Sequence, residues 1–184
     1  GLSGISGMVL GSVSGAVVSH ASCPVVVVRE DNAVTEENKY GPVVVGVDGS
    51  EVSRRATEVA FEEAAARGAE LHAVHTWVDT QIQGPGAGYA VSEDHWKAVR
   101  AEKDELLSSY LNELSEQYPD VVVKKAITRD RPVRALAAAA QGAQLLVTGS
   151  HGRGGFKGML LGSTSRALLQ EAPCPMMVVR TQDL

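Results

Sequence analysis

An internal repeat constrains this chain more than any other feature of its sequence. Residues Gly1–Arg29 align with residues Gly152–Arg180 at a constant offset and without a gap, and fifteen of the 29 aligned positions are identical. Self-similarity of this kind indicates that one structural unit occurs twice. We therefore expect residues 1–29 to be the C-terminal part of a preceding domain and residues 42–180 to form a complete second copy.

A polar segment lies between the two copies. Residues 30–41 are rich in Asp, Glu and Asn and end at Gly41, directly before Pro42. Such clusters between apolar segments are typical of connections rather than of helices or strands. We therefore expect a linker at residues 30–41, and a short tail at residues 181–184 after the complete domain.

Within residues 42–180, short β-branched runs alternate with longer amphipathic stretches. The run Val43–Val47 is apolar throughout, as a strand buried on both faces requires. Further strands are expected at Leu71–Val74, Val121–Ile127, Leu145–Thr148 and Met176–Val179. Helices are expected from Ser50 as N-cap to near Gly68, over Ser92–Tyr118, from Pro132 onward, and over Gly162–Glu171, with a loop at Asp79–Ala90. This alternation predicts an α/β fold with a doubly wound parallel sheet.

The most informative segment is the glycine-rich stretch Thr148–Thr164, which joins the fourth expected strand to the last helix. Glycine allows close approach of backbone to a ligand, and the free N–H groups of a helix N-terminus favour an anion. Basic or titratable side chains at His151, Arg153 and Lys157 add local positive charge. The segment therefore predicts a phosphate site. The P-loop spacing is absent, and the dinucleotide pattern fails because Lys157 replaces its third glycine.

The spacing of Gly149, Gly152, Gly162 and Ser163 reads G-x-x-G-x9-G-[ST] and resembles the ATP-binding signature of universal stress proteins. The resemblance extends over residues 42–180 and includes the opening Val45-Gly46-Val47-Asp48-Gly49-Ser50. It implies an α/β doubly wound five-stranded parallel sheet of order 3-2-1-4-5 with helices on both faces. It also implies ATP at the break between strands one and four, together with Mg²⁺ or Mn²⁺ held mostly by phosphate and water.

The resemblance implies roles for ten residues, without assigning a catalytic residue or a protein metal ligand set. The expected adenosine and ribose contacts are Gly46, Asp48, Thr76, Thr148 and Gly149. The expected phosphate contacts are Gly152, Arg153, Gly162, Ser163 and Thr164. A side chain at Gly149 or Gly162 is expected to fill space that the ribose or phosphate needs. Simpler interpretations remain: Asp48 as a turn carboxylate, Ser163 as an N-cap, and the basic loop residues as a solvated surface.

Three functions from different classes are compatible with this site. The first is a regulatory module that binds ATP in a stress or energy-state response. The second is a slow nucleotide hydrolase or transferase, which the absence of a His-x-Gly-His element after the first strand disfavours. The third is a nucleotide-free dimerisation scaffold, against which the intact glycine motif counts. Whether a cyclic nucleotide competes with ATP stays open.

Composition narrows the partners. The net charge of −5 argues against a nucleic-acid partner, which normally selects a basic excess. No apolar run reaches the length of a membrane span, and no secretory signal opens the chain, so no membrane partner is expected. Cys23 and Cys174 each precede a proline and do not suggest a disulfide framework, which favours a cytoplasmic setting.

The front segment carries its own prediction. Val25–Val28 is too apolar to remain in water, and in this family paired domains associate through their last strands. We therefore expect Val25–Val28 to pair antiparallel with Met176–Val179, either within one chain or in a homodimer. Such pairing would cover an edge strand that is otherwise exposed to aggregation.

Overall fold

The computed structural model describes residues 11–77, 93–154 and 160–181 of the chain. The expected loop at Asp79–Ala90 and Lys157 therefore lie outside the described residues. The described elements, in chain order, are α1 (Ser12–His20), β1 (Val25–Val27), β2 (Val43–Gly46), α2 (Glu51–Arg67), β3 (Leu71–Thr76), α3 (Glu93–Gln117), β4 (Val123–Thr128), α4 (Pro132–Ala139), β5 (Leu145–Gly149), α5 (Ser163–Glu171) and β6 (Met176–Val179).

The strands form one sheet of order β1-β6-β5-β2-β3-β4. The strands β2 to β6 are parallel and follow the expected order 3-2-1-4-5. The expectation of five strands needs one correction, because β1 adds a sixth strand that runs antiparallel to β6. The predicted pairing is thus confirmed within one chain, with Val26 opposite Met177.

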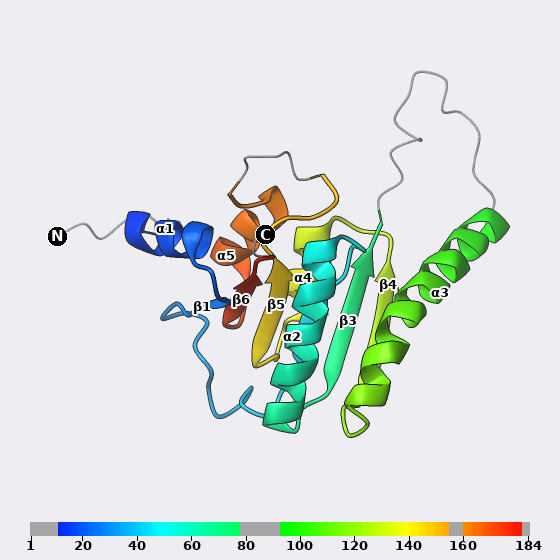
Figure 1. The fold of residues 1–184 in the computed structure, drawn as a ribbon, viewed down its shortest axis with the longest axis horizontal. Helices are drawn as coiled ribbons and strands as arrows, with labels where there is room; N and C mark the ends of the chain where they lie inside the picture. The colour runs from blue at the N-terminus through cyan, green and yellow to red at the C-terminus, as the bar shows by residue number, and fades with distance from the viewer. Residues whose placement is uncertain (1–10, 78–92, 155–159, 182–184) are drawn as a thin grey trace, which may run out of the picture.

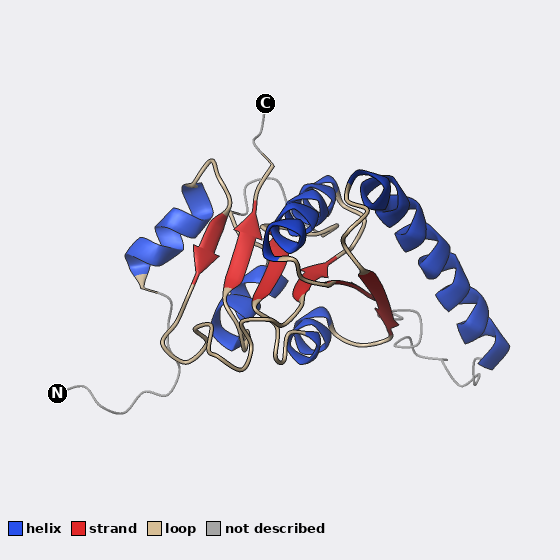
Figure 2. Ribbon diagram, turned by 90° about the horizontal axis from the view of Figure 1, so that it is seen from below, coloured by secondary structure: helices blue, strands red, loops and turns tan. Residues whose placement is uncertain are grey.

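Helices cover both faces of the sheet, with α2 and α3 on one side and α4 and α5 on the other (Figure 2). Successive side chains along a strand point to opposite faces of the sheet, so each strand contributes side chains to two hydrophobic cores. Val43 and Val45 pack with α2 and α3, whereas Val44 packs with α4 and α5. This double coverage explains why the strands read as continuous apolar runs.

Local signals set the ends of α2. The hydroxyl of Ser50 accepts a hydrogen bond from the N–H of Ser53 at the first turn, as expected of an N-cap. Gly68 ends the helix with φ of 58°, a left-handed conformation that glycine adopts without steric cost. Between them, Ala56, Val59, Ala60 and Ala64 are buried, as the helical spacing predicts.

The third expected strand begins later than predicted. The N–H of Val121 donates to the carbonyl of Tyr118 and closes a turn, so β4 begins only at Val123. At the carboxyl ends of these strands the pairing extends further than predicted. β3 continues to Thr76, which pairs with Thr128 of β4. These two shifts reflect hydrogen-bond partners that composition does not reveal.

The front segment packs against the second copy. Figure 1 shows α1 and β1 beside β6 and α5, and Val18 of α1 is buried in the same core as α5. The polar stretch after β1 is also anchored: Asn32 is only 2% exposed. Its amide Nδ2 donates to the carbonyls of Ala172 and Cys174, at 3.2 and 2.9 Å. Within the described ranges, no helix has the length and apolar character needed to cross a bilayer.

Candidate functional site

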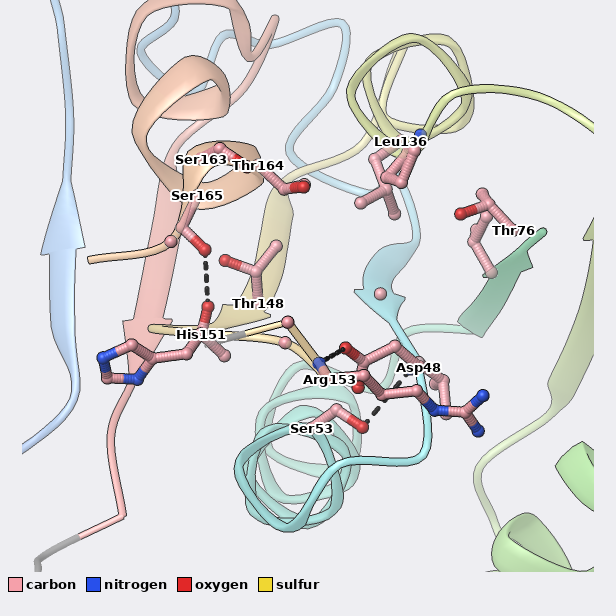
Figure 3. Close-up of a pocket in the computed structure, with 18 residues that line it drawn as sticks. Asp48, Ser53, Thr76, Leu136, Thr148, His151, Arg153, Ser163, Thr164 and Ser165 are labelled. Atoms are coloured by element: carbon pink, nitrogen blue, oxygen red, sulfur yellow. Dashed lines mark hydrogen bonds between the residues drawn. The ribbon is translucent and has the colours of Figure 1, made fainter. Parts of the chain in front are cut away.

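A cavity of about 420 Å³ opens at the carboxyl ends of β2 and β5. These neighbouring strands mark the point where the chain order reverses, which is where ligands bind in open α/β sheets. All ten residues predicted from the sequence line this cavity (Figure 3). They come from the end of β2, the end of β3, the end of β5, the following loop and the start of α5.

Sequence reasoning missed the apolar wall of the cavity. Val74, Pro132 and Leu136 also line it, and Figure 3 shows Leu136 of α4 opposite Thr148. The backbone of Gly46 passes so close to this wall that a Cβ there would lie 3.1 Å from Leu136 Cδ1. The helical spacing of α4 indicated only a core face. The proline at its first turn was the available signal, since Pro132 lines the same cavity as Thr76 at the end of β3.

Asp48 ties the turn after β2 to the loop after β5. Its Oδ1 accepts hydrogen bonds from the N–H and hydroxyl of Ser50, at 2.9 and 2.7 Å. Its Oδ2 accepts from the N–H of Arg153 at 2.9 Å. Burial raises the pKa of the Asp48 carboxyl, but these hydrogen bonds outweigh burial and hold that pKa below its usual value. Asp48 is therefore a charged side chain at the rim of the cavity that joins the turn to the loop. We call its hydrogen bonds to Ser50 and Arg153 the clasp.

Two glycines make this clasp possible. A Cβ at Gly152 would lie 2.3 Å from Oδ2 of Asp48, which is far inside van der Waals contact. Gly49 has φ of 82°, and a Cβ there would lie 2.5 Å from Nη2 of Arg153. Gly152 lets the loop approach the turn, whereas Gly49 allows the left-handed backbone of the turn itself.

Gly149 and Gly162 also lie close to other parts of the protein. A Cβ at Gly149 would lie 2.8 Å from Val52 Cγ1 of α2. A Cβ at Gly162 would lie 3.3 Å from both the Cα of His151 and the carbonyl oxygen of Ser150. Side chains there would thus meet the protein itself rather than only the volume of a ligand.

Hydrogen bonds hold both ends of the loop. The N–H of Ser150 donates to the carbonyl of Val179, and the N–H of Gly162 donates to the carbonyl of Ser150, each at 2.7 Å. The hydroxyl of Ser165 donates to the carbonyl of Gly149 at 2.6 Å (Figure 3). These bonds bring the start of α5 against the end of β5.

The start of α5 is suited to an anion. Gly162, not Ser163, occupies the N-cap position, and a glycine has no side chain with which to cap the helix. The first N–H groups of a helix have no intrahelical partner and carry the positive end of the helix dipole. Ser163 and Thr164 add hydroxyl groups at the same place and line the cavity.

Thr148 carries an unsatisfied polar atom beside this helix start. Its Oγ1 is buried and finds no hydrogen-bond partner among the described residues. Thr148 itself is only 4% exposed, and it lines the cavity. Buried hydroxyls are normally paired, because desolvation without a partner is costly. This atom is therefore a candidate partner for a polar ligand group.

The described side chains of Arg153 and His151 point in different directions (Figure 3). The guanidinium of Arg153 packs over Gly49, away from Ser163 and Thr164 (Figure 3). The ring of His151 points away from Asp48, and its Nδ1 lies 2.8 Å from the hydroxyl of Ser150. Within the described ranges, no group of three or more His, Cys, Asp or Glu side chains could hold a metal ion.

Comparison with known proteins identifies the family. A sequence model described as the universal stress protein family matches residues 1–29 and 39–180. The chain belongs to the universal stress protein family. Universal stress proteins Rv2005c and Rv1996 of Mycobacterium tuberculosis are 47% and 44% identical to it over 172 and 181 residues. These matches cover 93% and 98% of this chain but only 56% of each relative, so the chain spans about half their length.

Solved structures agree with this assignment. A universal stress protein from Archaeoglobus fulgidus is 26% identical, with a TM-score of 0.60, and the match covers 95% of this chain and 55% of that protein. A universal stress protein solved in complex with cAMP is also 26% identical, with a TM-score of 0.54 over 76% of this chain and 96% of that protein. The universal stress protein UspA from Lactobacillus plantarum shares the fold at 21% identity, with a TM-score of 0.63 over 77% of this chain and 98% of that protein.

Proposed function

We propose that the cavity between β2 and β5 binds ATP, and that the chain acts as a regulatory nucleotide-binding module in a stress or energy-state response. The observation that carries this proposal is the Oγ1 of Thr148, which has no hydrogen-bond partner in the described part of the chain, beside a start of α5 whose N-cap residue is a glycine. The cavity of about 420 Å³ lies within the usual range for small-molecule sites. A relative solved with cAMP supports an adenine nucleotide as the ligand class.

Different parts of the cavity suit different parts of the nucleotide. The apolar wall of Val74 and Leu136, with the close backbone of Gly46 and the strand end at Thr76, suits an adenine ring. Asp48 lies between this wall and the loop and is suited to the ribose. The start of α5, with Ser163 and Thr164, is suited to phosphate.

The proposal includes Mg²⁺ or Mn²⁺ bound together with ATP. Both carboxylate oxygens of Asp48 already accept hydrogen bonds from the protein, three in all, which leaves little of their acceptor capacity for an ion. We infer that phosphate oxygens and water would supply most of the metal ligands, as Mg²⁺ prefers.

A regulatory role fits the cavity better than catalysis. Asp48 is the one carboxylate among the described residues that line the cavity. Its lowered pKa and its three hydrogen bonds make it a poor base for activating water. Any hydrolysis should therefore be slow.

We further propose the organisation expected from the repeat: a tail of a preceding domain at residues 1–29, a linker at 30–41, a complete domain at 42–180 and a terminal tail at 181–184. The two separate segments matched by the family model support this division. A cytoplasmic location is proposed from the two free cysteines, and a homodimer is the alternative use of the last-strand surface. Sedimentation of the full chain would reveal a homodimer.

Isothermal titration calorimetry with ATP, cAMP and adenosine tests the proposed ligand. We expect ATP to bind most tightly, because only ATP places a triphosphate at the start of α5. The difference in affinity between ATP and adenosine should become smaller as the salt concentration rises, since salt screens charge. If adenosine binds as tightly as ATP, the assignment of a phosphate site at the start of α5 is wrong. If none of the three compounds gives a heat of binding, the proposed function is wrong. Release of phosphate measured over hours would separate binding from hydrolysis.

A further inference from the structure

Two arginines that the repeat places in equivalent positions bridge its two halves. Arg29 follows β1 and Arg180 follows β6, and the two align in the repeat. The guanidinium of Arg29 donates to the carbonyls of Leu169 and Ala172, at 2.9 and 2.8 Å. These carbonyls lie at the C-terminal end of α5, where a helix leaves acceptors unpaired and favours a cation.

Arg180 makes the reciprocal contact. Its Nη1 donates to the carbonyl of Ser19, in the last turn of α1. Each arginine therefore binds the end of the helix that belongs to the other half of the repeat. This reciprocity is what a pseudo-two-fold interface requires.

Arg180 makes one further contact that Arg29 does not. The same Nη1 atom also donates to the carbonyl of Leu160 at 3.2 Å. Leu160 lies two residues before Gly162, the N-cap of α5, and so belongs to the described part of the glycine loop. Next to Arg180, the carbonyl of Val179 accepts the N–H of Ser150 at the other end of that loop. The end of β6 thus contacts both ends of the loop as well as α1.

We propose that Arg180 is a positioning residue that couples nucleotide binding at the glycine loop to the docking of α1 and β1 against β6. The inference rests on the proposed ATP site. A nucleotide that holds the loop would hold the carbonyl of Leu160, and with it the guanidinium that binds the end of α1. Coupling between two sites is reciprocal, so docking of the front segment would strengthen nucleotide binding by the same factor.

Hydrogen exchange on the full, unmodified chain tests the coupling. We expect saturating ATP to slow exchange of the amides of Val25–Val27 by about fivefold or more, the usual size of such coupling. Binding of ATP is measured on the same sample by calorimetry. If ATP does not bind, the proposed function is wrong. If ATP binds and exchange in β1 does not change, the coupling alone is wrong.

Arg180→Gln and Arg29→Gln form a matched pair of variants. Both remove a cation from the end of a helix, but only Arg180 contacts the glycine loop. We expect Arg29→Gln to accelerate exchange in β1 while ATP still slows it. In Arg180→Gln the ATP effect on β1 should disappear, and ATP affinity should fall by about the coupling factor. If ATP slows exchange in β1 equally in both variants, the proposal is wrong. If Arg180→Gln does not fold, the exchange measurement on the unmodified chain decides whether the coupling exists.

Discussion

The backbone N–H of Arg153 donates a 2.9 Å hydrogen bond to Oδ2 of Asp48, which lies 105 residues earlier in the chain. This bond joins the turn after β2 to the loop after β5 and so closes one side of the cavity. It depends on Gly152, whose absent Cβ leaves room for the carboxylate.

Gly152→Ala should break the clasp. The added methyl would lie 2.3 Å from Asp48 Oδ2, so the carboxylate must move and give up its bond to the N–H of Arg153, or the loop and turn must separate. We expect a loss of about 1–3 kcal/mol in the free energy of unfolding, as overpacking usually causes, together with weaker ATP binding. Gly154→Ala is the control, because a Cβ there has no neighbour within 4 Å. If denaturant unfolding shows an equal loss of stability in the two variants, the proposed role of Gly152 in the clasp is wrong.

Thr148→Val should stabilise the protein while it weakens ligand binding. Valine keeps the branched shape and removes the unpaired hydroxyl, so we expect a gain of about 1 kcal/mol in the free energy of unfolding. ATP affinity should fall about three- to tenfold through the lost hydrogen bond. Thr57→Val is the matched control, since the Thr57 hydroxyl already donates to Ser53 at 2.7 Å. It should give no gain in stability and no change in affinity.

Asp48→Asn should alter the response to acid. The folded pKa of Asp48 is lowered, so its stabilisation is fully present above the ordinary value near pH ~4 and is lost as pH falls further. The variant should therefore show a smaller loss of stability below about pH 4 in urea titrations. Glu102→Gln is the control: its pKa is also lowered by Lys103, but at a fully exposed position where solvent screens the pair. A wild-type and Asp48→Asn difference that stays constant with pH would refute this role.

The two cysteines should differ in reactivity. Cys23 is exposed, whereas Cys174 is buried, and burial raises the pKa of the Cys174 thiol to about 11. A disulfide reagent at neutral pH should modify one thiol quickly and the second only after unfolding, because the thiolate is the reactive form. Cys23→Ser should abolish the fast phase. Two fast thiols in the folded wild-type protein would show that the last-strand core opens readily.

Local patterns were sufficient for most elements. The run at Val43–Val47, the cap at Ser50 and the left-handed Gly68 act through near neighbours, so their structural effects can be predicted from sequence alone. The candidate residues were implied by the resemblance of the glycine spacing to the universal stress protein signature, and they meet because parallel strands bring their carboxyl ends to one edge. The structural role of individual glycines in the loop could not be predicted. A Cβ at Gly149 would lie 2.8 Å from Cγ1 of Val52, which is nearly a hundred positions away in the chain.

The sequence by itself determined the alternation of strands and helices, the repeat, and the set of ten residues that meet at one cavity. Hydrophobic periodicity, capping and glycine spacing are properties of short segments and need no partner. Only the tertiary structure decided that β1 pairs with β6 in the same chain and that Leu136 forms the apolar wall. It alone decided that both oxygens of Asp48 bind the protein and that Arg180 joins α1 to the loop. Each of these depends on the distance between atoms far apart in sequence, which is set by how helices pack on the sheet.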